Sequence, residues 1–215
     1  MKTELPDFIW TEEDDGDQNF VPRQPTRTEI PGLPGEPGLW VFIIGDMTVF
    51  GWFFLVFMWE YSHDRTLFAD SVPELYRPIG VVNTLVLLFS SLFVVLGLHA
   101  HRNERPAALK RWLAGALICA FVFALLKAVE YSLEINAGHT PAQNTFFLFY
   151  FALTGIHLIH VLIGVGLLTA WWRSSAQTTT WRSKRVLAES AAVYWHMVDL
   201  LWIVIFTIVY LASTT

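Results

Sequence analysis

Five stretches of this chain are long and apolar enough to cross a lipid bilayer, and they decide its fold class. A spanning helix needs about 20 predominantly apolar residues, and hydrocarbon requires that backbone polar groups be satisfied within the segment. The stretches run over about Leu39–Trp59, Ile79–Ala100, Trp112–Ile135, Thr145–Trp172 and Ala191–Ala212. The sequence therefore predicts an all-α fold, a polytopic transmembrane bundle of five helices within residues 39–215.

The first 38 residues have a different composition from the rest of the chain. They hold nine acidic residues, three basic residues and six of the ten prolines. High charge, frequent proline and no apolar periodicity are typical of disordered segments. We expect residues 1–38 to form a disordered, acidic, proline-rich tail outside the membrane.

The basic residues are distributed unevenly between the two sides of the predicted membrane domain. With five spans, the tail and the 101–111 and 173–190 loops share one side and carry eleven Lys and Arg, whereas the other side carries only Arg65 and Arg77. Because cytoplasmic loops are enriched in Lys and Arg, we expect a cytoplasmic N-terminus and a C-terminus outside. The basic loops are short and flank membrane spans, so they indicate topology and lipid contacts, and we predict no nucleic-acid partner.

Seven acidic, basic or imidazole side chains lie more than one residue inside the ends of the predicted spans. They are Asp46, Lys127, Glu130, His157, His160, His196 and Asp199. A charge at the centre of a bilayer costs roughly 2.5–3.5 kcal/mol on insertion scales. Such residues are therefore expected either to have a functional role or to be paired with polar groups of other helices or subunits. Transport, binding and packing are the three interpretations that composition leaves open.

Six of the seven form pairs spaced three residues apart, which places both members on one helix face. Lys127 can neutralise Glu130, and the His157/His160 and His196/Asp199 faces are expected to make polar contacts with other helices or lipid. A His–Asp pair can also satisfy itself through an Nδ1–H to carboxylate bond. Asp46 has no such neighbour on its own helix, which makes it the candidate for a proton-linked carboxylate.

The spacing does not favour a metal centre. Di-iron helix bundles use Glu-x-x-His pairs, whereas this chain offers Lys-x-x-Glu, His-x-x-His and His-x-x-Asp. We therefore predict no metal or cofactor bound by this chain. The third span also carries Ala116, Ala120, Ala124 and Ala128 at a spacing of four. Small residues at this spacing let another helix approach closely, which predicts a central position for this span.

The order of the motifs resembles subunit III of the haem-copper respiratory oxidases. The matching stretches, in chain order, are Phe42-Ile-Ile-Gly-Asp46, Asn83-Thr84 with Ser91, Glu130-Tyr131, Thr154-Gly-Ile-His157-x-x-His160-Val-x-Ile-Gly164, and Tyr194-Trp-His196-x-Val-Asp199-x-x-Trp202. The fourth is the most specific, and together the motifs extend through all five spans.

The resemblance implies a non-catalytic accessory subunit in a bacterial inner membrane. Members of this family carry no haem or copper. They pack against a large haem-bearing catalytic subunit, where haem and in some cases copper are located, and they bind phospholipids. They are thought to support proton uptake and to protect the oxidase during turnover. The resemblance makes all seven intramembrane residues candidates for these proton-related and lipid-related roles.

Three departures from the family pattern accompany the resemblance. Family members usually have seven spans, and this chain lacks the first two, which form one arm of a lipid-holding cleft. The family's glutamate in the first matching span is Asp46 here. The segment Leu33-Pro-Gly-Glu-Pro-Gly-Leu-Trp40 resembles the short branch associated with bacterial nitric oxide reductases, and hence with denitrification.

The sequence leaves three alternatives open. The partner is either an oxygen reductase or a nitric oxide reductase. An assembly or activation factor for nitric oxide reductase would carry the same motifs. An independent proton or small-solute transporter is less favoured, because such proteins often have internal repeats and broken helices, and the predicted spans show neither.

Overall fold

The computed structural model describes residues 35–71, 77–175 and 181–211, and these residues form helices joined by short turns. The elements are α1 (Pro37–His63), α2 (Arg65–Ser71), α3 (Arg77–Arg102), α4 (Pro106–Asn136), α5 (Thr145–Ser174), α6 (Trp181–Phe206) and the π-helical segment η2 (Thr207–Leu211). Five helices within this part of the chain are long and apolar enough to cross a membrane. The predicted all-α bundle of five spanning helices is thus confirmed, whereas residues 1–34 of the predicted tail lie outside the described residues.

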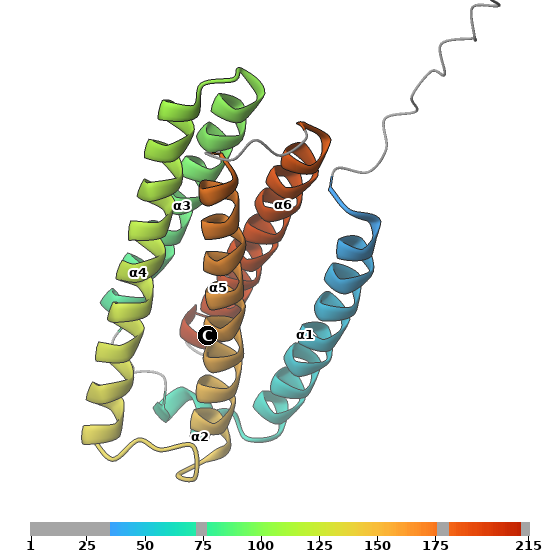
Figure 1. Ribbon diagram of the computed structural model, residues 1–215. Coiled ribbons are helices and arrows are strands. Elements are labelled where there is room, and N and C mark those ends of the chain that lie inside the picture. Colours follow the sequence, from blue (N-terminus) through green and yellow to red (C-terminus); the bar gives the residue numbers. More distant parts are fainter. Residues whose placement is uncertain (1–34, 72–76, 176–180, 212–215) are drawn as a thin grey trace, which may run out of the picture. The chain divides into compact units, whose positions relative to one another are not determined.

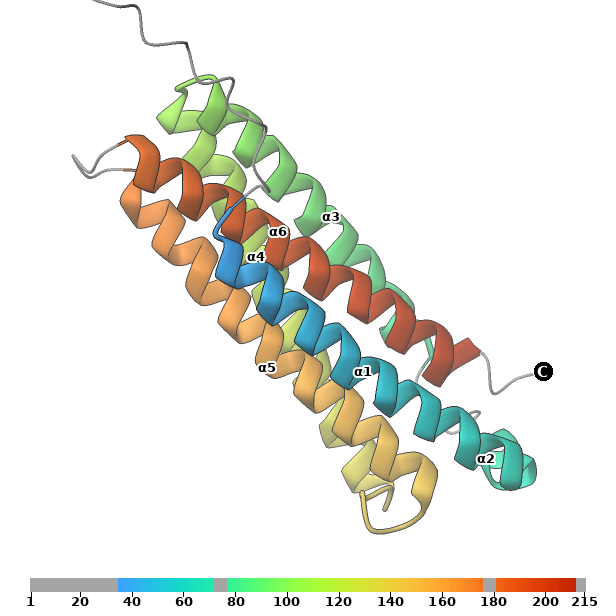
Figure 2. The same cartoon turned by 90° about the vertical axis from the view of Figure 1, so that its right-hand side faces the viewer.

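The long helices run alternately up and down (Figure 1). The start of α1, the α3–α4 turn and the start of α6 lie at one end, shown at the top of Figure 1. α6 packs against α5 on one side and α3 on the other, while α3 and α4 form the tightest pair. Figure 2 shows α1 in front of α5 and α6, and α1 contacts both helices. The short helix α2, which hydropathy did not predict, packs Phe68 against Phe57 of α1 and Phe146 of α5.

Local signals explain where several helices begin. Both α1 and α4 have proline in their first turn, at Pro37 and Pro106, where a missing N–H costs no hydrogen bond. The side chain of Asn144 caps α5 by accepting a hydrogen bond from the Phe147 N–H at 2.9 Å. Both α4 and α6 begin earlier than the predicted apolar spans, because hydropathy marks only the part of a helix that suits hydrocarbon.

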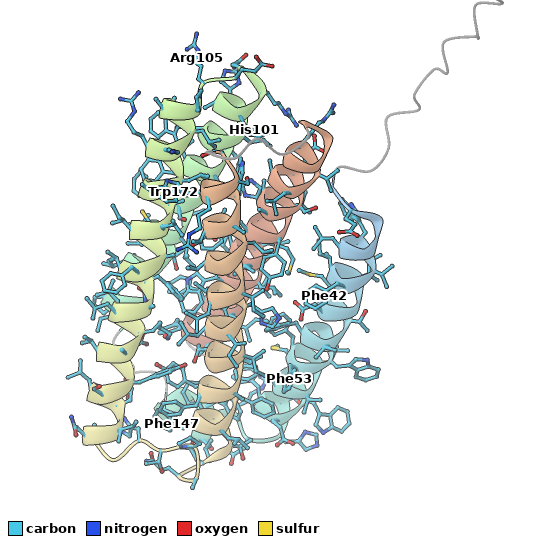
Figure 3. All side chains as sticks on the ribbon, viewed as in Figure 1. Phe42, Phe53, His101, Arg105, Phe147 and Trp172 are labelled. Carbon is cyan, nitrogen blue, oxygen red and sulfur yellow. The ribbon has the colours of Figure 1, made fainter. Side chains whose placement is uncertain are left out.

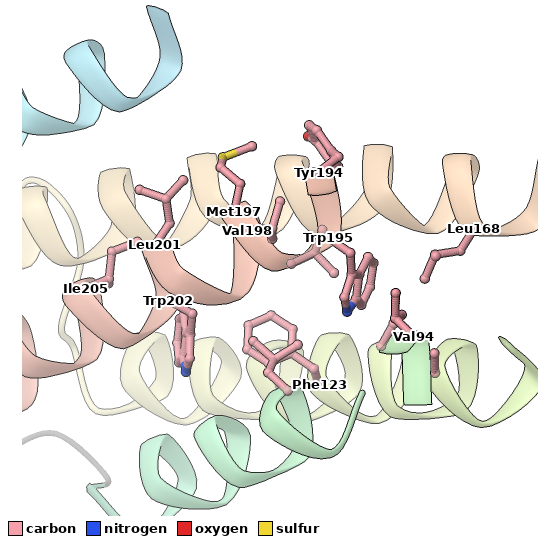
Figure 4. Close-up of a cluster of buried hydrophobic side chains, with 14 of the residues drawn as sticks. Val94, Phe123, Leu168, Tyr194, Trp195, Met197, Val198, Leu201, Trp202 and Ile205 are labelled. Carbon is pink, nitrogen blue, oxygen red and sulfur yellow. The ribbon is translucent and has the colours of Figure 1, made fainter. Parts of the chain in front are cut away.

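The core is built around α6, and the prediction that the third span is central was wrong. In the most apolar stretch of each helix, 56% of the residues are buried in α6, 28% in α4 and 17% in α1. Figure 4 shows Trp195 and Trp202 of α6 facing Val94 of α3 and Phe123 of α4. In α4, Ala116 and Ala120 are buried against neighbours but Ala128 is exposed, so only half of the alanine stripe serves helix packing. Side chains fill the space between the helices, with Phe42 and Phe53 on α1 (Figure 3).

Replacing Gly164 with alanine should destabilise the bundle. A Cβ at Gly164 would lie 2.7 Å from Cε3 of Trp195, whose side chain is fully buried and cannot retreat. Overpacking of this kind costs about 1–3 kcal/mol. We expect a lower thermal unfolding midpoint in detergent for Gly164→Ala, measured by circular dichroism.

Gly166 provides the matched control for this prediction. It lies on the same helix, and a Cβ there would meet nothing within 4 Å. Gly166→Ala should be neutral or raise stability by up to about 1 kcal/mol, because alanine loses less entropy than glycine in a helix. Equal midpoints for the two variants would show that the contact with Trp195 does not constrain position 164.

Candidate functional site

Lys127 and Glu130 on α4 form an ion pair buried between α4, α5 and the end of α6. The Lys127 Nζ lies 3.0 Å from Oε2 of Glu130, and neither side chain has exposed surface. The hydroxyls of Tyr150 and Tyr210 both donate to the other carboxylate oxygen, Oε1, with a distance of 2.9 Å for Tyr150. Lys127 also donates to the Tyr210 hydroxyl at 3.2 Å. Every charged atom of the pair has a partner, so the pair brings no uncompensated charge into the membrane.

Four aromatic rings surround the Lys127 ammonium. The distances from Nζ to the ring centroids are 5.3 Å for Tyr131, 5.1 Å for Tyr150, 5.1 Å for Trp202 and 5.8 Å for Tyr210. Each lies within the range of a cation–π interaction, which is strongest where water is excluded. The rings come from α4, α5, α6 and η2, so this cage joins several elements around one cation.

Asp46 of α1 meets His160 of α5. The Asp46 Oδ1 lies 3.0 Å from His160 Nε2, and each side chain is 11% exposed. The other imidazole nitrogen, Nδ1, lies 2.8 Å from the Ile156 carbonyl oxygen, which can only accept a hydrogen bond. Nδ1 must therefore carry a hydrogen, and in the neutral imidazole Nε2 is then an acceptor.

This geometry requires a proton between Asp46 and His160. A neutral imidazole facing an ionised carboxylate would place two acceptors 3.0 Å apart. The contact is a hydrogen bond only if the carboxyl is protonated or the imidazole is a cation. Either way the pair carries no net charge, and each side chain keeps a small exposed surface.

Two aromatic residues complete the surroundings of His160. The Phe50 ring lies edge-on to the imidazole, with ring centroids 5.5 Å apart. The Tyr194 hydroxyl of α6 donates to the His160 carbonyl oxygen at 3.3 Å. These contacts place His160 among α1, α5 and α6.

His196 and Asp199 do not satisfy each other, which corrects the pairing that their spacing suggested. The His196 Nδ1 lies 2.7 Å from the Ser91 hydroxyl of α3, so its polar contact is between helices. The Asp199 carboxyl is buried, and Ser91 lies close enough to interact with it. Neither carboxylate oxygen, however, has a partner with ordinary hydrogen-bond geometry among the described residues.

His157 is packed by rings and makes none of the hydrogen bonds that sequence analysis expected. It is fully buried, with Trp202 at 5.1 Å and Phe123 at 5.7 Å between ring centroids. Neither ring nitrogen has a hydrogen-bond partner in the described part of the chain. His157 and His160, although three residues apart, therefore have different environments.

Several residues of these networks were not predicted from the sequence. They are Tyr150 and Tyr210, which donate to Glu130 from α5 and η2, and Tyr194 and Ser91, which were noted only as parts of motifs. Their common signal is a hydroxyl inside an otherwise apolar span. A hydroxyl alone carries little information, because it can bond its own helix backbone, as Thr48 and Thr169 do.

Comparison with known families shows where this chain belongs. A family model described as cytochrome c oxidase subunit III matches residues 30–214, which include all five long helices. The chain belongs to the cytochrome c oxidase subunit III family. The match includes every intramembrane polar residue discussed above.

Individual subunit III relatives align over most of this chain. Cytochrome c oxidase subunit 3 of Synechocystis sp. is 31% identical over 192 residues, covering 86% of this chain and 81% of that protein. Cytochrome c oxidase subunit 3 of Schizophyllum commune is 29% identical over 183 residues, covering 80% of this chain but only 66% of that protein. The probable quinol oxidase subunit 3 of Staphylococcus haemolyticus is 25% identical over 181 residues, covering 84% and 90%.

In the described part of this subunit III family member, potential metal ligands meet at most in pairs. Within residues 35–71, 77–175 and 181–211, no three His, Cys, Asp or Glu side chains lie together in a way that could hold a metal ion. Of the buried polar groups discussed above, Lys127 pairs with Glu130 and Asp46 with His160.

Proposed function

We propose that this chain is a non-catalytic accessory subunit of a haem-copper respiratory oxidase in a bacterial plasma membrane. The observation that carries the proposal is the subunit III match over residues 30–214. In this proposal a large catalytic membrane subunit holds haem, with or without copper, and the present chain binds no metal or cofactor of its own. The N-terminus is cytoplasmic and the C-terminus outside, which the eleven basic residues on one side support.

The proposal gives the Asp46–His160 pair a proton-linked role. The pair needs one proton for its hydrogen bond, and each side chain keeps 11% of its surface exposed. In contrast, the Lys127–Glu130 pair is wholly enclosed by its aromatic cage. We assign proton exchange in support of the catalytic subunit to Asp46 and His160, and a structural role to Lys127 and Glu130.

The proposal also includes contact with phospholipids. An apolar groove of about 290 Å³ lies between α1 and α5, lined by Val49, Trp52, Phe53, Val56 and Phe149. Its lining offers a lipid tail apolar contacts and almost no polar atoms. Such a groove suits an acyl chain beside the Asp46 helix.

Purification from native membranes tests the proposed function. A tagged chain should recover a large membrane subunit with a haem Soret band, whereas the chain expressed alone should show neither that band nor stoichiometric copper or iron. Recovery without any haem protein would overturn the proposal. Tight metal binding by the isolated chain would overturn the assignment of the redox centres to a partner.

The resemblance of residues 33–40 to the reductase-associated branch favours a second partner, a nitric oxide reductase. Assays of oxygen and nitric oxide reduction by the same purified complex distinguish the two partners. An assembly factor would lower reductase activity on deletion while being absent from the purified reductase. A transporter would instead support flux in liposomes as the isolated chain.

A further inference from the structure

α1 is the least buried of the long helices and has few anchors in the bundle. Its buried apolar side chains are Ile43, Phe50 and Phe57, spaced seven residues apart on one face. In the most apolar stretch of α1, only 17% of the residues are buried. A single stripe of apolar contacts resists sliding of α1 along its axis only weakly, because one apolar side chain of the stripe can take the place of the next. The axial position of α1 therefore depends on directional contacts.

Such contacts occur immediately before α1, at the end of the bundle shown at the top of Figure 1. The Gly35 N–H donates to Oε2 of Glu189 at 3.3 Å, and the Glu36 N–H donates to the Ser190 hydroxyl at 3.1 Å. Both acceptors belong to α6. Two successive backbone amides are thus fixed on two successive side chains, and we refer to these four residues as the clasp.

Gly35 fits the clasp because it has no side chain. Its φ of +82° lies in the left-handed region, and a Cβ there would lie 2.8 Å from the Ser190 hydroxyl oxygen and 3.2 Å from the Ser190 backbone. Any other residue would both strain the backbone and push the chain away from α6. A Cβ at Gly38, one turn later, would meet nothing within 4 Å.

Glu189 is held in place from its other side. Its Oε1 accepts from Nε of Arg185 at 3.0 Å and lies 3.9 Å from Nη2 of Arg102 at the end of α3. The Glu189 side chain is 11% exposed, whereas those of both arginines are mostly exposed. One carboxylate therefore connects the segment before α1 with α3 and α6.

The clasp has a consequence ten residues further along α1. A helix rises 1.5 Å and turns about 100° per residue, so fixing Glu36 fixes both the depth and the direction of Asp46, about 15 Å away. A slip of one residue would turn Asp46 away from His160. We propose that Glu189 is a positioning residue, which with Ser190 and Gly35 sets the register of α1 so that Asp46 meets His160.

Spin-label distances in the full chain, reconstituted in lipid nanodiscs, test the register directly. Labels at Val41 of α1 and Leu162 of α5, both exposed, would be introduced with Cys119 replaced by alanine. The parent chain should give a narrow distance distribution. Gly35→Ala and Glu189→Ala should broaden or shift it, whereas the matched control Gly38→Ala should leave it unchanged. An unchanged distribution in both Gly35→Ala and Glu189→Ala would overturn the proposal.

A second measurement separates this inference from the proposed function, on which its proton-linked consequence rests. In the native complex, Glu189→Ala should slow turnover, and it should add little to the effect of Asp46→Asn because both act on one contact. Additive losses would overturn the positioning role. If Glu189→Ala changes the label distances, but neither Glu189→Ala nor Asp46→Asn changes turnover, the positioning role of Glu189 is supported. The proton-linked role of Asp46 is then contradicted.

Discussion

Replacing Lys127 with methionine is expected to destabilise the bundle by about 3–5 kcal/mol, as is usual when one partner of a buried ion pair is removed. The change leaves the Glu130 carboxylate fully buried, with only the Tyr150 and Tyr210 hydroxyls to compensate its charge. The four rings around the ammonium would lose their cation as well. The free energy of unfolding in mixed detergent micelles, followed by circular dichroism, measures the effect.

The double variant Lys127→Met, Glu130→Gln tests whether the uncompensated charge of Glu130 causes the loss of stability. Glutamine keeps a carbonyl oxygen that can accept from the tyrosine hydroxyls but carries no charge, so most of the lost stability should return. Lys110→Met, at the start of the same helix, removes a cation that is not fully buried and should cost less than about 1 kcal/mol. Equal losses for the single and double variants would mean that the uncompensated charge is not what destabilises the fold.

The fold could be predicted from the sequence because bilayer thickness imposes a length on every span. The five spans agree with α1, α3, α4, α5 and α6 to within several residues at most ends. The centre of the bundle could not be predicted in this way. The alanine stripe of α4 favours close packing, but the large rings Trp195 and Trp202 of α6 decide which helix is surrounded.

The candidate site could be predicted only where both partners lie on one helix. A spacing of three placed Lys127 beside Glu130, and they form the expected ion pair. The same spacing in His196 and Asp199 gave the wrong partner, because the imidazole contacts the Ser91 hydroxyl on α3 instead. Asp46 and His160 are 114 residues apart, and helix rotation and tilt, which hydropathy does not encode, bring them together.

Replacing Asp46 with asparagine is expected to slow turnover of the partner complex, or shorten its active life, without loss of assembly. The asparagine amide can donate to His160 Nε2 and so preserve the hydrogen bond between α1 and α5. It cannot exchange a proton at ordinary pH. Asp46→Leu should instead lower stability by about 1–3 kcal/mol, because it leaves the Nε2 acceptor without a partner. Oxygen or nitric oxide consumption by the purified complex, recorded over repeated turnovers, measures the functional effect.

Infrared difference spectroscopy separates the proton-linked role from simple packing. If the shared proton resides on the carboxyl, the parent chain should show a protonated-acid band that disappears in Asp46→Asn; if it resides on His160, an imidazolium signal should disappear instead. In the double variant Asp46→Asn, His160→Gln, turnover should fall no further than in Asp46→Asn alone, because both residues hold one proton. Unchanged turnover and lifetime in Asp46→Asn would leave Asp46 and His160 as a packing contact between α1 and α5, and the proton-linked role would have to be assigned to another part of the complex.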